Sequence, residues 1–211
     1  MVDRLALLAV ATLGLACAAS AQPIAASPHT DPPAAGIAAP LKAMLADGGA
    51  CAQIGEATLT FWWVKSLPVA GAPEWANVAE GSLVGAVQIP AVFRDIRGRT
   101  IKPGVYTLRY GVQPQDGDHI GVSSFRDYLL LSPAAVDLDP APAGHDGTIN
   151  MSKKTVGASH PGAWMLNPPT TSEAALTTGS NDMKLQYVVI EVPTTSGAMR
   201  FGLVLIGKVE T

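Results

Sequence analysis

The chain has 211 residues, of which 15% are charged, and its formal net charge is -3 at neutral pH. A chain without a basic excess does not fit nucleic acid or an anionic membrane surface as its principal partner. Its length suits one domain with a substantial core, and its 21 Gly and 17 Pro favour strands and turns over helices.

The first residues have the pattern of an export signal. An apolar run at residues 5–16 precedes the small-x-small sequence Ala-Ser-Ala at 19–21. The run is shorter than the roughly 18 to 20 residues that span a bilayer, which argues against an uncleaved anchor. We therefore expect cleavage after Ala21 and a periplasmic or secreted mature chain that has no transmembrane segment. A lipoprotein acylated at Cys17 is the alternative, although Gly14 stands where a large aliphatic residue is expected.

Residues 22–38 differ in composition from the rest of the chain. They are mostly Ala, Pro, Ser and Gly with almost no large apolar side chain, so they predict a flexible Ala/Pro-rich tether. A short helix is predicted at residues 40–45, because Pro40 suits a first helical turn. We expect a single folded domain at residues 39–211.

Most of the remaining chain has the composition of β-strands. Residues 51–54 and 57–67 predict a hairpin around the Gly55-Glu56 turn. Five further runs rich in β-branched and aromatic residues predict strands at 82–93, 105–112, 128–131, 185–192 and 199–209. These strands, with one short N-terminal helix and long loops, predict an all-β fold, an antiparallel β-sandwich.

The turn at Pro103-Gly104 allows the register of one strand to be predicted. Side chains alternate along a strand, so Tyr106 and Leu108 are expected to face the core, while Val105, Thr107 and Arg109 face the other way. We expect the basic residues of this region to lie along a solvated edge strand; binding of an anionic polymer or lipid headgroup is the alternative. These residues are Arg94, Arg97, Arg99, Lys102 and Arg109.

Five short blocks are distinctive in this sequence. They are LTFWW at 59–63, IKPGVYTLRY at 101–110, DGDHIGVS at 116–123, RDYLLL at 126–131 and SHP at 159–161. Together they resemble an uncharacterised family of exported bacterial β-sandwich proteins. The resemblance implies a bacterial, periplasmic or secreted single domain. Because that family has no assigned activity, it assigns no role to any residue.

Three histidines lie in segments rich in Gly, Asp and Pro that connect the predicted strands. They are His119, which follows Asp118, His145 and His160. Imidazole and carboxylate groups are ligands for Zn²⁺ and Cu²⁺, so Asp118, His119 and His160 form a candidate divalent-metal site on loops of the sandwich. The alternative is that these side chains hydrogen-bond loop backbone, since their spacing matches no metal-ligand motif.

A hydrolase is a third alternative. Ser123, Asp127 and His119 are of the types that form a catalytic triad, but Phe125 stands where Gly-x-Ser-x-Gly requires glycine. No residue is therefore assigned a catalytic or cofactor-binding role. We expect a non-catalytic binding or interaction module of the bacterial envelope, whose partner is an envelope protein or a glycan and not a nucleic acid.

Overall fold

The computed structural model describes residues 23–115, 117, 125–168 and 173–207. Within these ranges there are two α-helices, α1 (Ala39–Met44) and α2 (Gly144–Val156), and a 3-10 turn at Trp75–Asn77. The strands of the described chain are β1 (Ile24–His29), β2 (Leu45–Ile54), β3 (Ala57–Val64), β4 (Leu83–Ile89), β5 (Phe93–Arg94), β6 (Thr100–Ile101), β7 (Gly104–Val112), β8 (Asp127–Pro133), β9 (Ala163–Asn167), β10 (Thr178–Ser180), β11 (Gln186–Thr194) and β12 (Gly197–Ile206). The predicted signal at residues 1–21 lies outside the described residues.

Several elements match their sequence-based expectations. The hairpin around Gly55-Glu56 is confirmed as β2 and β3, whose ends pair at Ile54 and Ala57. The five further expected strands correspond to β4, β7, β8, β11 and β12, and α1 corresponds to the expected short helix.

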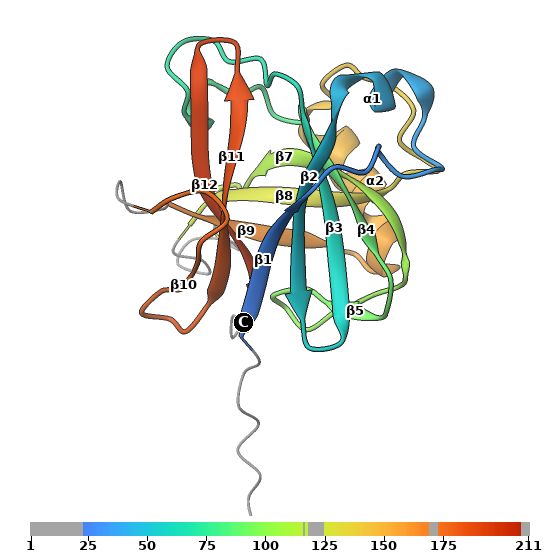
Figure 1. The fold of residues 1–211 in the computed structure, drawn as a ribbon. Helices are drawn as coiled ribbons and strands as arrows, with labels where there is room; N and C mark the ends of the chain where they lie inside the picture. Colours follow the sequence, from blue (N-terminus) through green and yellow to red (C-terminus); the bar gives the residue numbers. More distant parts are fainter. Residues whose placement is uncertain (1–22, 116, 118–124, 169–172, 208–211) are drawn as a thin grey trace, which may run out of the picture.

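Ten strands form one antiparallel sheet in the order β1-β2-β3-β4-β7-β8-β9-β12-β11-β10. The sheet curls until β1 approaches β10 and β11, so that it is nearly closed into a barrel (Figure 1). An isolated parallel bridge between Leu67 and Thr194 joins the chain after β3 to the end of β11. The antiparallel, mostly β architecture is confirmed, but the expected sandwich is wrong, because one continuous sheet takes the place of two packed sheets.

Irregular pairing explains how a single sheet bends this far. Register shifts lie between Leu45 and Gly49 of β2, between Leu83 and Gly85 of β4, and between Gln186 and Tyr187 of β11. A bulge of this kind bends the strand that carries it and increases the local twist. Successive bends therefore bring the first strand of the sheet back towards the last.

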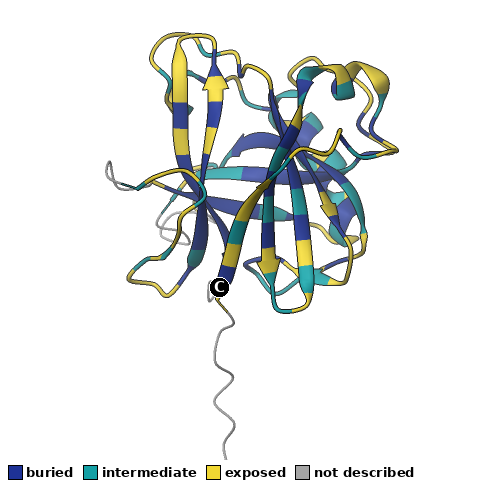
Figure 2. Ribbon diagram, viewed as in Figure 1, coloured by how far each residue is buried: buried dark blue, intermediate teal, exposed yellow. Residues whose placement is uncertain are grey.

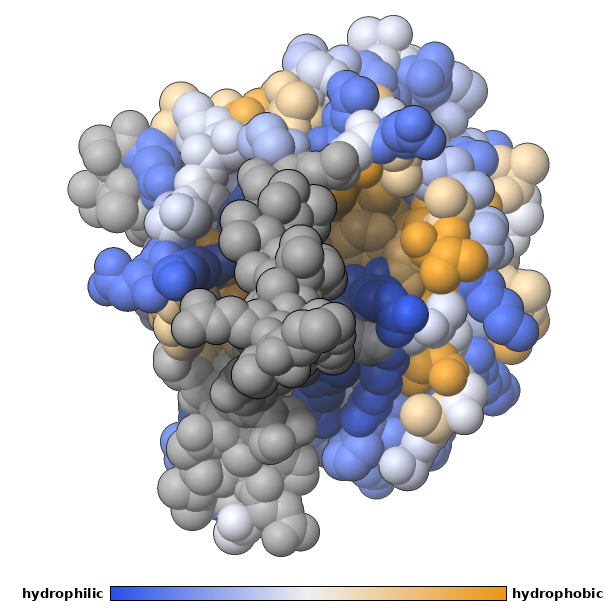
Figure 3. Space-filling model, turned by 90° about the horizontal axis from the view of Figure 1, so that it is seen from below, coloured by the Kyte–Doolittle hydropathy of each residue, from blue (hydrophilic) through white to orange (hydrophobic). Residues whose placement is uncertain are grey.

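Aromatic side chains fill the interior of the barrel. Phe61 and Trp63 of β3 stack with their ring centroids 5.5 Å apart, and Phe201 of β12 makes an edge contact with Trp63 at 5.9 Å. Trp164 of β9 packs against Phe61 at 5.7 Å. Buried residues form bands along the strands (Figure 2), and hydrophobic residues line a hollow on the lower side of the molecule (Figure 3). These rings therefore form the core of the barrel.

The segment expected to be a flexible tether contains β1. Residues 24–29 pair along their whole length with β2. The His29 Nε2 atom lies 2.9 Å from the Phe61 carbonyl oxygen, and the Trp62 indole N–H donates to the Asp31 carbonyl at 2.9 Å. The tether expectation is wrong for this segment, because an edge strand needs few large apolar side chains when backbone pairing and side-chain contacts hold it.

The second helix, α2, was not expected from the sequence. Its buried face consists of small hydroxyl residues, Thr148, Ser152 and Thr155, so the segment lacks an apolar period. Ser152 donates to the Gly162 carbonyl at 2.8 Å, and Thr155 donates to the Leu131 carbonyl at 2.7 Å. These hydrogen bonds fasten α2 to β8 and to the chain before β9.

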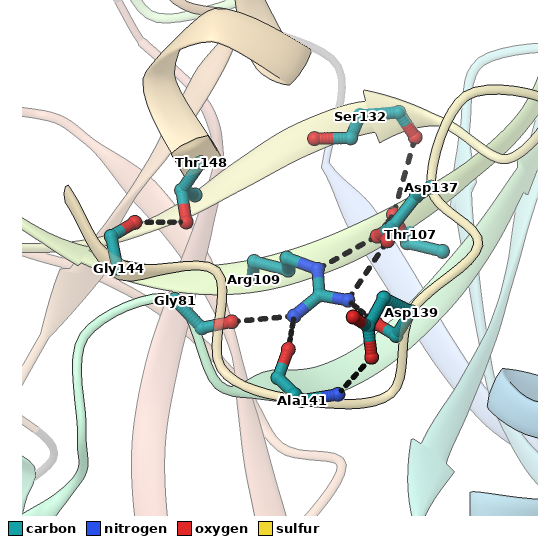
Figure 4. A network of polar contacts seen from close by, with 9 residues as sticks. All are labelled: Gly81, Thr107, Arg109, Ser132, Asp137, Asp139, Ala141, Gly144 and Thr148. Atoms are coloured by element: carbon teal, nitrogen blue, oxygen red, sulfur yellow. Dashed lines mark hydrogen bonds and ion pairs between the residues drawn. The ribbon is translucent and has the colours of Figure 1, made fainter. Parts of the chain in front are cut away.

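The alternation predicted for residues 105–110 is confirmed, but the second face of this strand is buried as well. Tyr106 and Leu108 lie in the barrel core, whereas Arg109 is fully buried beneath the segment that follows β8 (Figure 4). Its guanidinium forms a bidentate ion pair with Asp137, with Nε–Oδ2 at 2.7 Å and Nη2–Oδ1 at 2.8 Å. The expected solvated edge is therefore wrong for Arg109, because β7 is a central strand between β4 and β8.

Candidate functional site

A cleft of about 340 Å³ lies on the outer side of the sheet, where α2 and the loop between β5 and β6 flank β7, β8 and β9. Its floor is apolar and consists of Gly111, Leu130 and Ala163, one from each of these three strands. Gly111 adds no side chain to the floor, and a Cβ at this position would lie 2.9 Å from Leu130 Cδ1, which is too close. The cleft has the size of a small-molecule site, roughly 300 to 1,000 Å³.

One wall of the cleft is a face of α2. His145, Ile149 and Lys153 line it, because residues four apart lie on the same side of a helix. Glu80 holds His145 in place, with the imidazole Nδ1 and the carboxylate Oε1 2.7 Å apart. The same Glu80 oxygen accepts the backbone N–H of Val112 at 3.1 Å. Since a carboxylate only accepts hydrogen bonds, Nδ1 is the donor in this contact.

Glu80 reaches α2 because the following residue, Gly81, lies close to the start of that helix. Gly81 has a φ of 84°, and a Cβ there would lie 2.4 Å from the Gly144 backbone nitrogen. Its carbonyl oxygen accepts the Ala143 N–H at 3.2 Å. Arg109 Nη1 donates to the same oxygen at 2.6 Å (Figure 4). Glycine permits both the positive φ and the close approach, which a side chain would prevent.

The opposite wall carries a buried carboxyl group, that of Asp95. Its Oδ1 accepts the backbone N–H groups of Arg97 at 3.0 Å and of Arg99 at 2.8 Å, which fixes the turn between β5 and β6. Asp95 is only 3% exposed, and its Oδ2 is buried without a hydrogen-bond partner among the described residues. Burial raises the pKa of this carboxyl above its ordinary value, and the two N–H groups and the charges of both arginines oppose that rise.

The sequence-predicted metal site is described only in part. Asp118 and His119 lie outside the described residues. His160 is described, and it lines the mouth of the cleft together with Ser159. His145, expected in a loop, lies in the first turn of α2 and reaches the same cleft. Within the described ranges, no group of three or more His, Cys, Asp or Glu side chains is placed to hold a metal ion.

Of the suggested catalytic triad, Asp127 alone lies in the described part of the chain. Ser123 and His119 fall outside it. Asp127 accepts the Tyr110 hydroxyl at 2.6 Å, and burial is the main cause that raises the pKa of Tyr110. This hydrogen bond links Asp127 of β8 to Tyr110 of β7.

Sequence reasoning missed three polar residues of the cleft, namely Glu80, Asp95 and Lys153. Glu80 and Lys153 belong to no motif, and the one usable signal for Asp95 was its place before the Gly98 turn, which indicates a turn-forming aspartate.

Comparisons with known protein families, with curated proteins and with solved structures found no match to this chain. In the part of the chain that the structure describes, no helix is both long enough and apolar enough to span a membrane.

Proposed function

We propose that this protein is a non-catalytic binding module that takes a small ligand in the cleft between α2 and the outer face of β7, β8 and β9. The observation that carries the proposal is a concave site with an apolar floor and polar walls, which include the side chains of Glu80, His145 and Lys153. Binding sites commonly combine apolar lining with a few convergent polar groups.

The binding proposal can be tested by filling the cleft. Ala163 is half-buried on its floor, so Ala163→Trp places an indole where the ligand would lie. Ala198, an exposed strand residue away from the cleft, supplies the matched control Ala198→Trp. A ligand that binds only the native state raises the melting temperature according to its concentration and affinity.

We therefore expect at least one class among neutral sugars, amines and carboxylic acids at millimolar concentration to stabilise wild type and Ala198→Trp but not Ala163→Trp. Stabilisation of none of the proteins, or of all three equally, would reject the cleft as the binding site. Hydrolysis of p-nitrophenyl acetate that Ala163→Trp abolishes would favour the hydrolase instead. Stoichiometric Zn or Cu in the purified full chain would favour a metal protein that uses Asp118, His119 and His160.

We also propose that the chain is exported and acts in the periplasm or outside the cell, which its N-terminal sequence supports. The intact mass of the envelope protein should correspond to a chain that starts at Gln22, because Ala19 and Ala21 suit signal peptidase. A diacylglyceryl group on Cys17 would show instead that the protein is a lipoprotein.

A further inference from the structure

We infer that this protein docks onto anionic lipid membranes through the hairpin of β5 and β6 and the adjoining end of α2, an interaction that goes beyond the binding function of the cleft. The docking region is called the basic surface below. It consists of six cationic side chains, Arg94, Arg97, Arg99, Lys102, Lys153 and Lys154.

The positive charges of this protein are unevenly distributed, although its net charge is negative. The hairpin and the residue after it carry four cationic side chains against one carboxyl group, that of Asp95, which is buried. The helix α2 adds Lys153 and Lys154 in its last turn, while its acidic residue, Asp146, lies in the first turn. Because α2 packs beside β6 and because Arg97 and Lys153 line the same cleft, the two groups of cations form one surface.

These cations are available to an external anion. Arg94, Lys102 and Lys154 are exposed, and the other three are half-buried. Within the described ranges, none of the six forms an ion pair with a carboxylate, although the charges of Arg97 and Arg99 act on the buried Asp95 carboxyl. The surface therefore keeps most of its positive charge for a partner, and anionic headgroups attract such clusters of Lys and Arg.

An exposed apolar segment precedes the first of these cations. Pro90, Ala91 and Val92 are all exposed, and Val92 is 64% exposed. The next residue, Phe93, packs edge-on against the core residue Trp164 with the ring centroids 6.0 Å apart, which holds the segment to the barrel. A run of exposed apolar residues is unfavourable in water and indicates a contact surface. The strand β5 lies at the lower side of the molecule (Figure 1), where hydrophobic and strongly hydrophilic residues adjoin (Figure 3).

The apolar segment favours a lipid membrane over a soluble polyanion as the partner. Cationic side chains gain from either one, but only a bilayer has an apolar layer beneath its anionic headgroups. On a membrane, Val92 leaves water at the headgroup level while Arg94 and Lys102 contact lipid phosphates. A soluble polyanion would leave Val92 in water.

The experiment is co-sedimentation of the chain that starts at Gln22 with phosphatidylcholine vesicles, prepared with or without about 30 mol % phosphatidylglycerol, at about 0.15 M salt. Wild type should bind the anionic vesicles and not the neutral ones. Raising the salt to about 1 M should release most of the protein, because the Debye length then falls to about 3 Å.

The charge variants remove three exposed cations of the basic surface. Arg94→Gln/Lys102→Gln/Lys154→Gln should weaken binding about a hundredfold, since each cation near an anionic surface contributes a factor of about five. The matched control, Lys42→Gln/Lys65→Gln/Lys184→Gln, makes the same change in net charge elsewhere on the molecule and should weaken binding less than about fivefold.

The apolar contact is tested by a second pair of variants. Val92→Ser should weaken vesicle binding about fivefold, because part of one apolar side chain no longer leaves water. Leu138, which is 62% exposed in the segment after β8, supplies the control Leu138→Ser. This control should bind within about twofold of wild type, since a single exposed apolar residue outside the surface adds no membrane contact.

The inference is overturned if neither vesicle binds, if both bind equally, or if the triple variant of the basic surface binds as well as its control. It is also overturned if Val92→Ser binds vesicles like wild type while dextran sulfate binds through the same three cations, because the surface would then serve a polyanion. The outcome is independent of the cleft ligand, since none of the substituted residues lines the cleft.

Discussion

Replacing Arg109 with methionine should remove a large part of the stability of this protein. The Arg109 and Asp137 side chains are each only 1% exposed. Arg109 also donates to the Gly81 and Ala141 carbonyls, at 2.6 and 2.9 Å, and to the Asp139 carbonyl (Figure 4). In Arg109→Met the buried Asp137 carboxylate keeps one side-chain hydrogen bond within the described chain, from the Thr107 hydroxyl 2.5 Å away. Breaking a buried ion pair from one side costs about 3 to 5 kcal/mol, roughly a fifth or more of the unfolding free energy of a typical domain.

Urea unfolding near neutral pH, followed by tryptophan fluorescence, measures this loss. Arg200→Met is the matched control, because Arg200 pairs with Glu191 at 2.5 Å while 45% exposed, and such surface pairs contribute about 0 to 1 kcal/mol. The double variant Arg109→Met/Asp137→Leu should lose less than Arg109→Met alone, since no lone charge stays buried. A loss in Arg109→Met no larger than in Arg200→Met, or a double variant less stable than Arg109→Met, would refute the assignment of Arg109 and Asp137 as a coupled buried pair.

Three other measurements test the fold and the cleft. Burial raises the pKa of Asp95 above 3.8, so the native state holds the Asp95 proton more tightly than the unfolded chain does. Asp95 therefore lowers the free energy of unfolding as the pH rises above 3.8. Asp95→Asn should therefore gain unfolding free energy relative to wild type as the pH rises above 3.8; a constant or falling difference contradicts this. Leu108→Ala should cost about 2 to 5 kcal/mol by opening the core, and Thr107→Val about 1.5 to 3 by removing the hydrogen bond to Asp137, both measured by urea unfolding. A Thr107→Val variant as stable as wild type would speak against that bond. Amide hydrogen exchange should show protected N–H groups within residues 24–29, whereas exchange as fast as in an unfolded chain would restore the tether expectation.

Local features of the fold were predictable because they depend on residues close together in the sequence. The hairpin at Gly55-Glu56 follows from turn chemistry, since Gly55 has a φ of 60°. The alternation of Tyr106 and Leu108 with their neighbours follows from the two-residue period of a strand. Closure of the sheet was not predictable in this way, because it depends on bulges in several strands that no single stretch of sequence reveals.

Buried polar residues account for most of the other errors. Arg109 is indistinguishable in sequence from an exposed arginine, and only the fold brings Asp137 to it. The inner face of α2 is made of Thr and Ser residues that bond to backbone carbonyls, so hydrophobic periodicity could not reveal the helix. The cleft was hidden for a related reason, since Glu80, Asp95 and Lys153 lie on three separate segments.

The buried ion pair and the cleft belong to one arrangement of the chain. Arg109 holds Gly81 and Ala141 through their carbonyl oxygens, which brings the segment before β4 against the segment that leads into α2. Glu80 immediately precedes Gly81, and its partner His145 lies four residues after Ala141. The geometry of the Glu80–His145 wall therefore depends on an ion pair that is not itself part of the cleft lining. A buried ion pair often adds no more to the free energy of unfolding than apolar residues of the same size would. Its directional bonds nevertheless fix two loops relative to each other, as a binding site built on loops requires.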